Sequence, residues 1–286
     1  MASSPIVARW ELSLRLGAKR KELNLDVKSV TDAAGFSRNY WSAVENDRTL
    51  IADDKLRILI DLLQFDDDEA ADLLELREAA RRRGWWEDFP TFDEAMTRFV
   101  GLEDGASHIR SFEGLLIPGL LQAPAYSRCV IESDPVISSV ETDRALQFRG
   151  MRQRRLTGAD RVHYSAIMSE AALRQHVGDR EVQIEQLSHL TDLIERYPDS
   201  IEVRVLPFSR DPGMIVNSST LNFFDYARKH LPTVAFQEAV RALGVIEYGD
   251  RQFRRLELAW MEGKKRSLDR DESLTLIEDV AASMSG

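Results

Sequence analysis

Residues 27–45 of this 286-residue chain read VKSVTDAAGFSRNYWSAVE and predict two short helices joined by a tight turn. The first helix, roughly 27–34, ends before Gly35, which can adopt the left-handed backbone conformation that stops a helix. Ser37 offers a hydroxyl that can cap the next helix, which runs to about Glu45. Such a pair presents the N-terminal side chains of its second helix to a groove, which is typical of the helix-turn-helix motif.

The flanking sequence predicts three more helices, so that residues 10–80 form a bundle of about five. Asp53 or Asp54 can cap the fourth helix through its carboxylate. The fifth starts in the acidic run at Asp66 and ends in arginines before Gly84, an order of charges that the helix dipole favours. Leucines recur with the 3.6-residue period of one helix face in the first helix, at Leu12, Leu16 and Leu23.

Arg20 falls on this apolar stripe, between Leu16 and Leu23. A charge on an inward face needs a partner, because a buried ion without one is strongly destabilising. Glu45 comes directly after the inward-facing Val44 at the end of the third helix. We therefore predict a structural ion pair between Arg20 and Glu45.

Residues 84–90, GWWEDFP, interrupt the helical pattern and predict a domain boundary. The expected domains are a helix-turn-helix domain over 1–83 and a regulatory or dimerisation domain over 84–286. Strands and helices mix in the second part without strict alternation, so the fold class is an all-α domain of about five helices followed by a larger α+β domain. The expected strands are 109–112, 161–168, 201–206, 220–224 and 234–239, and the expected helices are 123–133, 138–156, 170–197, 250–262 and 270–284.

The net charge of −10 hides an uneven distribution. Residues 1–60 carry ten Lys or Arg against eight Asp or Glu, whereas residues 61–80 carry one Arg against eight acids. A field that attracts DNA phosphate is therefore confined to the first sixty residues.

A cytoplasmic location without a membrane span is expected from three absences in the sequence. Cys129 is the only cysteine, which excludes a disulfide framework within the chain and fits a reducing compartment. The N-terminus lacks the basic and apolar regions of a signal peptide. No stretch approaches 18 uninterrupted apolar residues.

The sequence offers no catalytic or metal-binding motif, so we expect no enzymatic activity, no metal and no cofactor. There is no Gly-x-Ser-x-Gly nucleophile turn and no Gly-x-Gly-x-x-Gly loop. The histidines are scattered, without the His-x-x-x-His spacing of a zinc helix, at His108, His163, His176, His189 and His230.

The first part of the chain resembles the helix-turn-helix proteins of the xenobiotic-response-element type, which are phage-repressor-like. Arg20 and Glu45 match the structural ion pair of that family, and Gly35 matches its turn glycine. The resemblance implies binding to double-stranded DNA, with phosphate contacts at Ser37 and Asn46, groove-facing side chains at Arg38, Asn39, Ser42 and Ala43, and a backbone contact at Arg48.

Several positions depart from that family, among them Tyr40-Trp41, which is bulkier than most. The start of the second helix, often Gln or Thr and used on DNA, is Val27 here, and we include the following Lys28 among the predicted DNA-binding residues. Asp47 stands where glycine is frequent.

The rest of the chain resembles a C-terminal domain of unknown function that follows such motifs in many actinobacterial regulators. The resemblance implies a transcriptional regulator, sometimes classed as antitoxin-like and often encoded beside a small partner protein, whose C-terminal domain has no accepted enzymatic activity. The match rests on LIPGLLQ at 116–122, Tyr126, Arg152-Gln153, SEAALR at 169–174, Gln186-Leu187 and VLPF at 205–208.

The predicted function is a sequence-specific DNA-binding regulator that binds an inverted repeat as a homodimer. One alternative is an antitoxin-type module that binds a small protein encoded nearby and autoregulates its operon. A second is a repressor that senses a small molecule in a pocket of the C-terminal domain. A basic cluster on the expected helix 138–156 comprises Arg144, Arg149, Arg152, Arg154 and Arg155. It is either a solvated face or a dock for an acidic partner, with Arg149, Arg152, Arg154 and Arg155 as the expected partner-binding residues.

Overall fold

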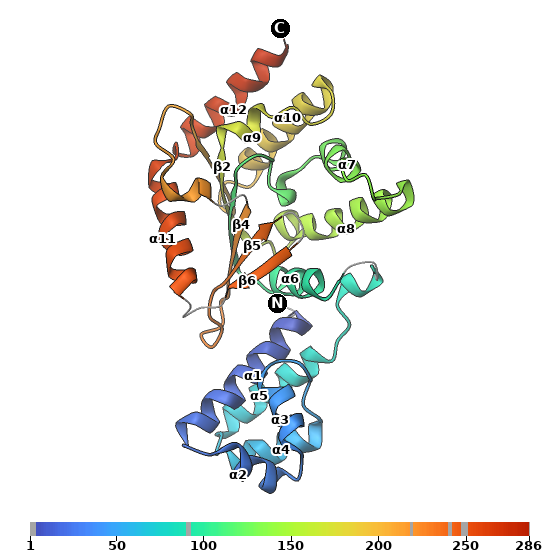
Figure 1. Cartoon of the computed structure of the whole chain (residues 1–286), viewed down its shortest axis with the longest axis vertical. Helices are drawn as coiled ribbons and strands as arrows, with labels where there is room; N and C mark the ends of the chain where they lie inside the picture. Colours follow the sequence, from blue (N-terminus) through green and yellow to red (C-terminus); the bar gives the residue numbers. More distant parts are fainter. Residues whose placement is uncertain (1–3, 90–92, 218–219, 240–241, 247–250, 286) are drawn as a thin grey trace. The chain divides into compact units, whose positions relative to one another are not determined.

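The computed structural model describes residues 4–89, 93–217, 220–239, 242–246 and 251–285 (Figure 1). The chain forms two compact units, and each is described by itself. Unit 1 comprises residues 1–105 with the segment 227–232, and unit 2 comprises residues 106–226 and 233–286.

The division falls after Gly105, whereas the sequence predicts a boundary after residue 83. Residues 84–89 and 93–105 pack within unit 1: Trp86 is buried, and the hydroxyl of Ser4 donates to the carbonyl of Gly101 at 2.5 Å. The domain limits predicted from the sequence, 1–83 and 84–286, therefore stay a prediction.

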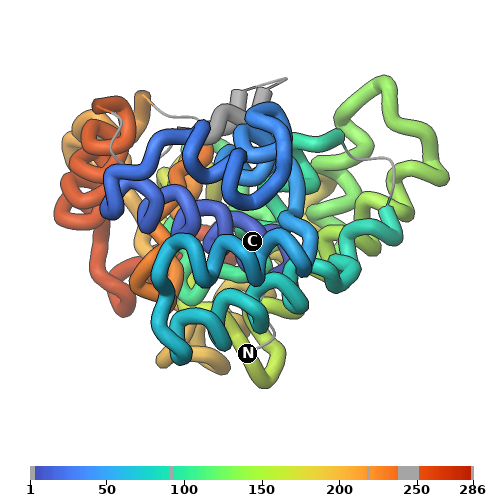
Figure 2. Tube along the Cα trace, turned by 90° about the horizontal axis from the view of Figure 1, so that it is seen from below, coloured from blue at the N-terminus to red at the C-terminus, as the bar shows by residue number. Residues whose placement is uncertain are grey.

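Unit 1 is helical, as the sequence predicts, and α1 and α5 run side by side in Figures 1 and 2. Its elements are α1 (Pro5–Glu22), α2 (Val27–Ala34), α3 (Arg38–Glu45), α4 (Asp53–Leu62), α5 (Asp67–Ala80), the 3-10 turn η1 (Trp85–Asp88) and α6 (Glu94–Asp104).

Local capping sets the ends of α2 and α3. The side chain of Asp26 accepts a hydrogen bond from the Ser29 amide at 2.7 Å at the start of α2. Gly35 ends that helix with φ of 65°, in the left-handed region that glycine adopts without strain. Ser37 then caps α3 by accepting from the Tyr40 amide at 3.1 Å. These caps confirm the predicted helix-turn-helix geometry.

The starts of α4 and α5 differ in how they are capped. Asp66 accepts from the Glu69 amide at 2.8 Å, and the Glu69 side chain accepts from the Asp66 amide at 3.2 Å, which is a capping box. The prediction that Asp53 or Asp54 caps α4 is wrong. Ala52 occupies the capping position and Asp53 is the first helical residue, where its charge still favours the helix dipole.

One apolar core joins the helices of unit 1. Trp41 and Val44 of α3 point inward and are buried, which leaves the opposite face of α3 to solvent. The buried members of this core are Leu12, Leu16, Val30, Ala34, Trp41, Val44, Ile51, Leu56, Leu59, Ile60, Leu63 and Leu73.

Unit 2 is built on a mixed six-stranded sheet in the order β3-β2-β1-β4-β5-β6, which confirms the α+β prediction. β1 pairs in parallel with β2, and β2 with β3, whereas the pairs β1–β4, β4–β5 and β5–β6 are antiparallel. Of these strands β6 was not expected. The strands are β1 (His108–Glu113), β2 (His163–Ser169), β3 (Ile201–Leu206), β4 (Thr220–Asp225), β5 (Val234–Ala239) and β6 (Ala242–Ile246).

The single helix expected over 170–197 is wrong, because the structure has two. Gly178 lies between them with φ of 72°, and Asp179 caps the second by accepting from the Val182 amide at 2.9 Å. The helical elements of unit 2 are η2 (Gly119–Leu121), α7 (Pro124–Glu132), α8 (Ser139–Thr157), α9 (Glu170–Arg174), α10 (Arg180–Arg196), η3 (Gly213–Asn217), α11 (Arg251–Arg266) and α12 (Arg270–Ser285).

Helices cover both faces of the sheet, with α11 on one side and α8 on the other in Figure 1. Phe112 and Phe223 of the sheet pack with Phe253 and Trp260 of α11 in one buried cluster. Leu268, just before α12, and Ser273, in α12, form hydrogen bonds with the outer edge of β3. There the Leu268 amide donates to the Val205 carbonyl at 2.8 Å, and the Val205 amide donates to Ser273 Oγ at 2.9 Å.

Candidate nucleic-acid interface

The face of α3 opposite Trp41 and Val44 carries most of the predicted DNA-binding residues. A helix repeats every 3.6 residues, so positions 38, 39, 42, 43 and 46 share one face. Arg38, Asn39 and Asn46 are exposed, and Ser42 and Ala43 are half-buried. The capping hydroxyl of Ser37 is at the N-terminal end of the same helix. The structure therefore brings these predicted residues together on one accessible surface.

The end of this surface is ordered by hydrogen bonds among its own side chains. Ser42 Oγ accepts from Arg48 Nη2 at 3.1 Å and from Asn46 Nδ2 at 3.4 Å, and Asn46 Nδ2 also donates to the Ser42 carbonyl at 2.7 Å. Arg48 is thus folded back beside α3. A guanidinium held in place loses less conformational entropy when it binds a phosphate oxygen.

Lys28 lies on α2, and its charge is balanced locally. Its ammonium nitrogen is 2.5 Å from Asp32 Oδ2, and both side chains are more than 60% exposed, at 64% and 63%. The hydrogen bond to Asp32 raises the pKa of Lys28. The side chain is therefore cationic at neutral pH, but a phosphate would have to compete with Asp32 for it.

Arg20 and Glu45 lie together in an ion pair. Arg20 donates to Glu45 Oε1 from Nη2 at 2.7 Å and from Nε at 3.0 Å, while Nη1 donates to the Leu25 carbonyl at 2.8 Å. Their side chains are 14% and 20% exposed, so the pair is partly solvated rather than fully buried. Gly17 leaves room for it, because a Cβ there would lie 3.3 Å from Glu45 Cγ. The pair anchors the end of α3 to α1.

Asp47 is a structural residue whose role the sequence reasoning missed. It adopts φ of 54°, the backbone conformation for which glycine is frequent at this position. Its buried carboxylate accepts from Arg9 Nε at 2.8 Å and from Arg98 Nη1 at 2.9 Å. The ion pairs offset the backbone strain and fix the loop after α3 to α1 and α6. The presence of an acidic residue at a position that favours glycine was the signal in the sequence that could have indicated this role.

The basic cluster predicted on α8 does not form a single exposed face. Arg149 donates to the Gln122 side chain, and Arg155 donates to the Asp160 carbonyl at 2.8 Å and the Ala106 carbonyl at 2.7 Å. Arg154 is exposed and Arg152 is half-buried. Binding of a partner protein by these arginines stays a prediction.

The sheet of unit 2 brings together a histidine and a serine that the sequence separates widely. His108 Nε2 lies 2.9 Å from Ser165 Oγ, and burial lowers the pKa of His108. Asp225 Oδ2 is 3.8 Å from His108 Nδ1, beyond hydrogen-bond reach. The Asp225 carboxylate instead accepts from Arg110 at 2.8 and 3.0 Å and from Thr233 at 2.6 Å. The hydrogen bond that orients the base in a hydrolase triad is therefore not formed.

The part of the chain that the structure describes shows neither a metal site nor a membrane-spanning helix. Within it, no group of three or more His, Cys, Asp or Glu side chains has a geometry that could hold a metal ion. Nor does any helix in that part of the chain have the length and apolar character needed to cross a bilayer.

The capped helix pair and the mixed sheet define a helix-turn-helix protein with a second, α+β domain. Residues 11–73 match a helix-turn-helix domain, which supports a DNA-binding regulator. Residues 96–279, more than half of the chain, match the domain of unknown function DUF5753, and the chain belongs to this family. No curated protein and no solved structure matches the chain.

Proposed function

We propose that this chain is a sequence-specific transcriptional regulator of the xenobiotic-response-element type, which reads double-stranded DNA with α3. The observation that carries the proposal is the exposed face of α3, where Arg38 and Asn39 occupy the first helical turn. Side chains in the first turn of a recognition helix reach base edges in the major groove. Arginine fits guanine O6 and N7 with two hydrogen bonds, and asparagine fits adenine N6 and N7.

Phosphate contacts come from the polar residues around this face in the proposed complex. Ser37 and Asn46 lie at the two ends of α3, and Arg48 lies beside it. Contacts to phosphate position a protein on the duplex, whereas contacts to bases specify the sequence.

The protein acts as a homodimer in this proposal. Residues 1–60 carry only two more basic than acidic residues, so one head makes few phosphate contacts. Counterion release grows with the number of phosphates contacted, and two heads nearly double it. The acidic α5 would be repelled by DNA, and Figure 2 shows its turns, in teal, apart from the blue turns of α2 and α3. Residues beyond 60 then form the dimer contact.

The test is DNase I footprinting of the full chain on the promoter of its own gene. We expect protection of an inverted repeat whose half-sites are about one helical turn apart, roughly 34–36 Å. Unrelated duplex of equal length serves as competitor. Protection that the unrelated duplex removes as readily as the promoter itself would contradict sequence-specific binding.

A further inference from the structure

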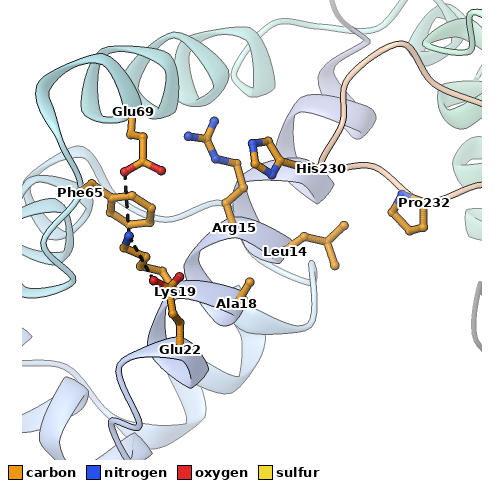
Figure 3. A pocket seen from close by; sticks show the side chains of 9 residues that line it. All are labelled: Leu14, Arg15, Ala18, Lys19, Glu22, Phe65, Glu69, His230 and Pro232. Carbon is orange, nitrogen blue, oxygen red and sulfur yellow. Dashed lines mark ion pairs between the residues drawn. The ribbon is translucent and has the colours of Figure 1, made fainter.

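Unit 1 contains a pocket away from the exposed face of α3. Its volume is about 400 Å³, within the range of small-molecule sites. Its walls come from α1, from Phe65 before α5, from Glu69 in the first turn of α5 and from the segment 227–232, and all of these belong to unit 1 (Figure 3).

The pocket has an apolar wall suited to a flat ligand. Leu14 and Ala18 are one turn apart on α1, and Phe65 and Pro232 complete the wall. Ala18 is exposed and Leu14 is half-buried, so the wall can be reached from solvent. Burying an apolar body here removes its surface and that of the wall from water, which is the main source of affinity in such sites.

Hydrogen-bond donors collect at one end of the pocket. Figure 3 shows Arg15 and His230 next to each other there. The Arg15 side chain is 6% exposed, lines the pocket and pairs with Asp72 through Nη1. A guanidinium has five N–H donors, so Arg15 has further donors for a bound ligand. Burial lowers the pKa of His230, and the charges of Arg15, Lys229 and Arg228 lower it further against the opposing effect of Glu11.

The other end of the pocket carries more negative than positive charge. Lys19 Nζ is 3.8 Å from Glu22 Oε1 and 4.0 Å from Glu69 Oε2, and it lies 5.5 Å from the centre of the Phe65 ring. One cation between two carboxylates offers no excess positive charge. At the Arg15 and His230 end, the guanidinium groups of Arg15 and Arg228 balance the carboxylates of Asp72 and Glu11. Lys229 adds a further positive charge near His230, so an anionic ligand group is favoured at this end over the Lys19 end.

We propose that this pocket binds a small organic monoanion with a flat apolar body, of the aromatic carboxylate class. The carboxylate accepts hydrogen bonds from Arg15 and His230, and the ring packs against Leu14, Ala18 and Phe65. Charge-assisted hydrogen bonds of this kind are roughly twice as strong as neutral ones.

A ligand in this pocket is also expected to change the affinity for DNA, and this consequence rests on the proposed function. α1 carries the pocket wall at Leu14 and Ala18, and it carries Arg20, which holds Glu45 of α3. A ligand on α1 therefore acts on the helix that anchors the recognition helix.

The test uses three probes with the same naphthalene ring and different charge on the full chain without DNA: 1-naphthoate, 1-naphthalenemethanol and 1-naphthylmethylammonium. Calorimetric titration should give 1-naphthoate an affinity about tenfold or more above the other two, as expected when a charge-assisted hydrogen bond is lost. Equal affinities of the three probes, or no heat from 1-naphthoate at millimolar concentration, would overturn the proposal.

Two variants locate the site. Ala18→Trp fills the pocket from an exposed helical position and should abolish 1-naphthoate binding, whereas Ala71→Trp, on an exposed position of α5 that does not line the pocket, should leave it intact. Binding that survives Ala18→Trp would place the ligand elsewhere and overturn the assignment. The titration contains no DNA, so its result does not depend on the proposed function. If the footprint fails while 1-naphthoate still binds, only the proposed function is contradicted.

Discussion

Arg228 Nε lies 2.5 Å from Oε2 of Glu11, a carboxylate in α1 that is completely shielded from solvent. The same guanidinium donates from Nη2 to both oxygens of Asp72, at 2.8 and 2.6 Å. The positive charge of Arg228 lies directly against the Glu11 carboxylate and compensates its burial. One arginine thereby attaches the segment 227–232 to α1 and α5 within unit 1.

Replacing Arg228 by Met should destabilise the protein, because it leaves Glu11 buried without a countercharge. Breaking a fully buried pair costs about 3–5 kcal/mol, and since Arg228 is 41% exposed we expect about 2–3 kcal/mol in urea unfolding. The double variant Glu11→Leu/Arg228→Met should recover most of the loss. Lys229→Met, which removes the neighbouring exposed cation, is the control, and an equal loss in that variant would contradict the role of the pair.

The pair Arg20–Glu45 should contribute less than a buried pair because both side chains retain solvent contact. We expect Glu45→Gln and Arg20→Met each to lower the free energy of unfolding by about 1.5–3 kcal/mol, the range for hydrogen bonds to charged groups. A double-mutant cycle isolates the coupling of the two side chains. Single losses that add fully in the double variant would show that the two residues do not interact.

Removing Arg38 should impair base recognition. Arg38→Ala should weaken specific binding by about 1–3 kcal/mol and relax the preference at one base pair, measured by fluorescence anisotropy on a set of operator variants. Arg254→Ala, which removes an exposed cation from α11, should leave binding unchanged. Unaltered affinity and base preference in Arg38→Ala would remove this residue from the DNA-reading surface.

Arg48 should show a different signature from Arg38. If it contacts phosphate, Arg48→Ala weakens binding evenly across DNA sequences and lowers the slope of log K against log salt by about 1. Titration at several salt concentrations measures that slope. A loss confined to one operator base pair would instead make Arg48 a base-reading residue.

Acid should destabilise unit 2 partly through Asp225. Burial opposes its charge, but hydrogen bonds from Arg110 and Thr233 outweigh that effect and hold the pKa of Asp225 below its ordinary value of 3.8. A carboxylate with a lowered pKa stabilises the fold above pH 3.8, and this stabilisation disappears as pH falls through the folded pKa. Asp225→Asn should be less stable than the parent at pH 7, with a difference that shrinks below pH 4. A difference that stays constant with pH would exclude this titration.

Light scattering tests the proposed dimer. The chain mass is 32.6 kDa, and we expect twice that value for the free protein and for its complex with one inverted repeat, after subtraction of the DNA. A single chain mass in both measurements would contradict the dimer.

Several features of the recognition unit could be predicted because they depend on neighbouring residues. Ser37 caps α3 and Gly35 ends α2 through contacts within a few positions along the chain. The break between α9 and α10 could not be predicted in this way, although Gly178 is visible in the sequence. A Cβ at Gly178 would lie 2.8 Å from Cys129 Sγ, so the approach of α7, together with the positive φ of this residue, requires glycine here.

The sequence by itself determined the helix pair and its exposed face, since caps, a turn glycine and helical periodicity act over a few residues. Tertiary structure alone decided the order of the six strands, the pairing of β6, and the attachment of Arg228 to Glu11. These contacts join residues far apart in the chain. Their stability depends on which apolar surfaces are buried together and on which charges then lose their water, and no local pattern in the sequence encodes either.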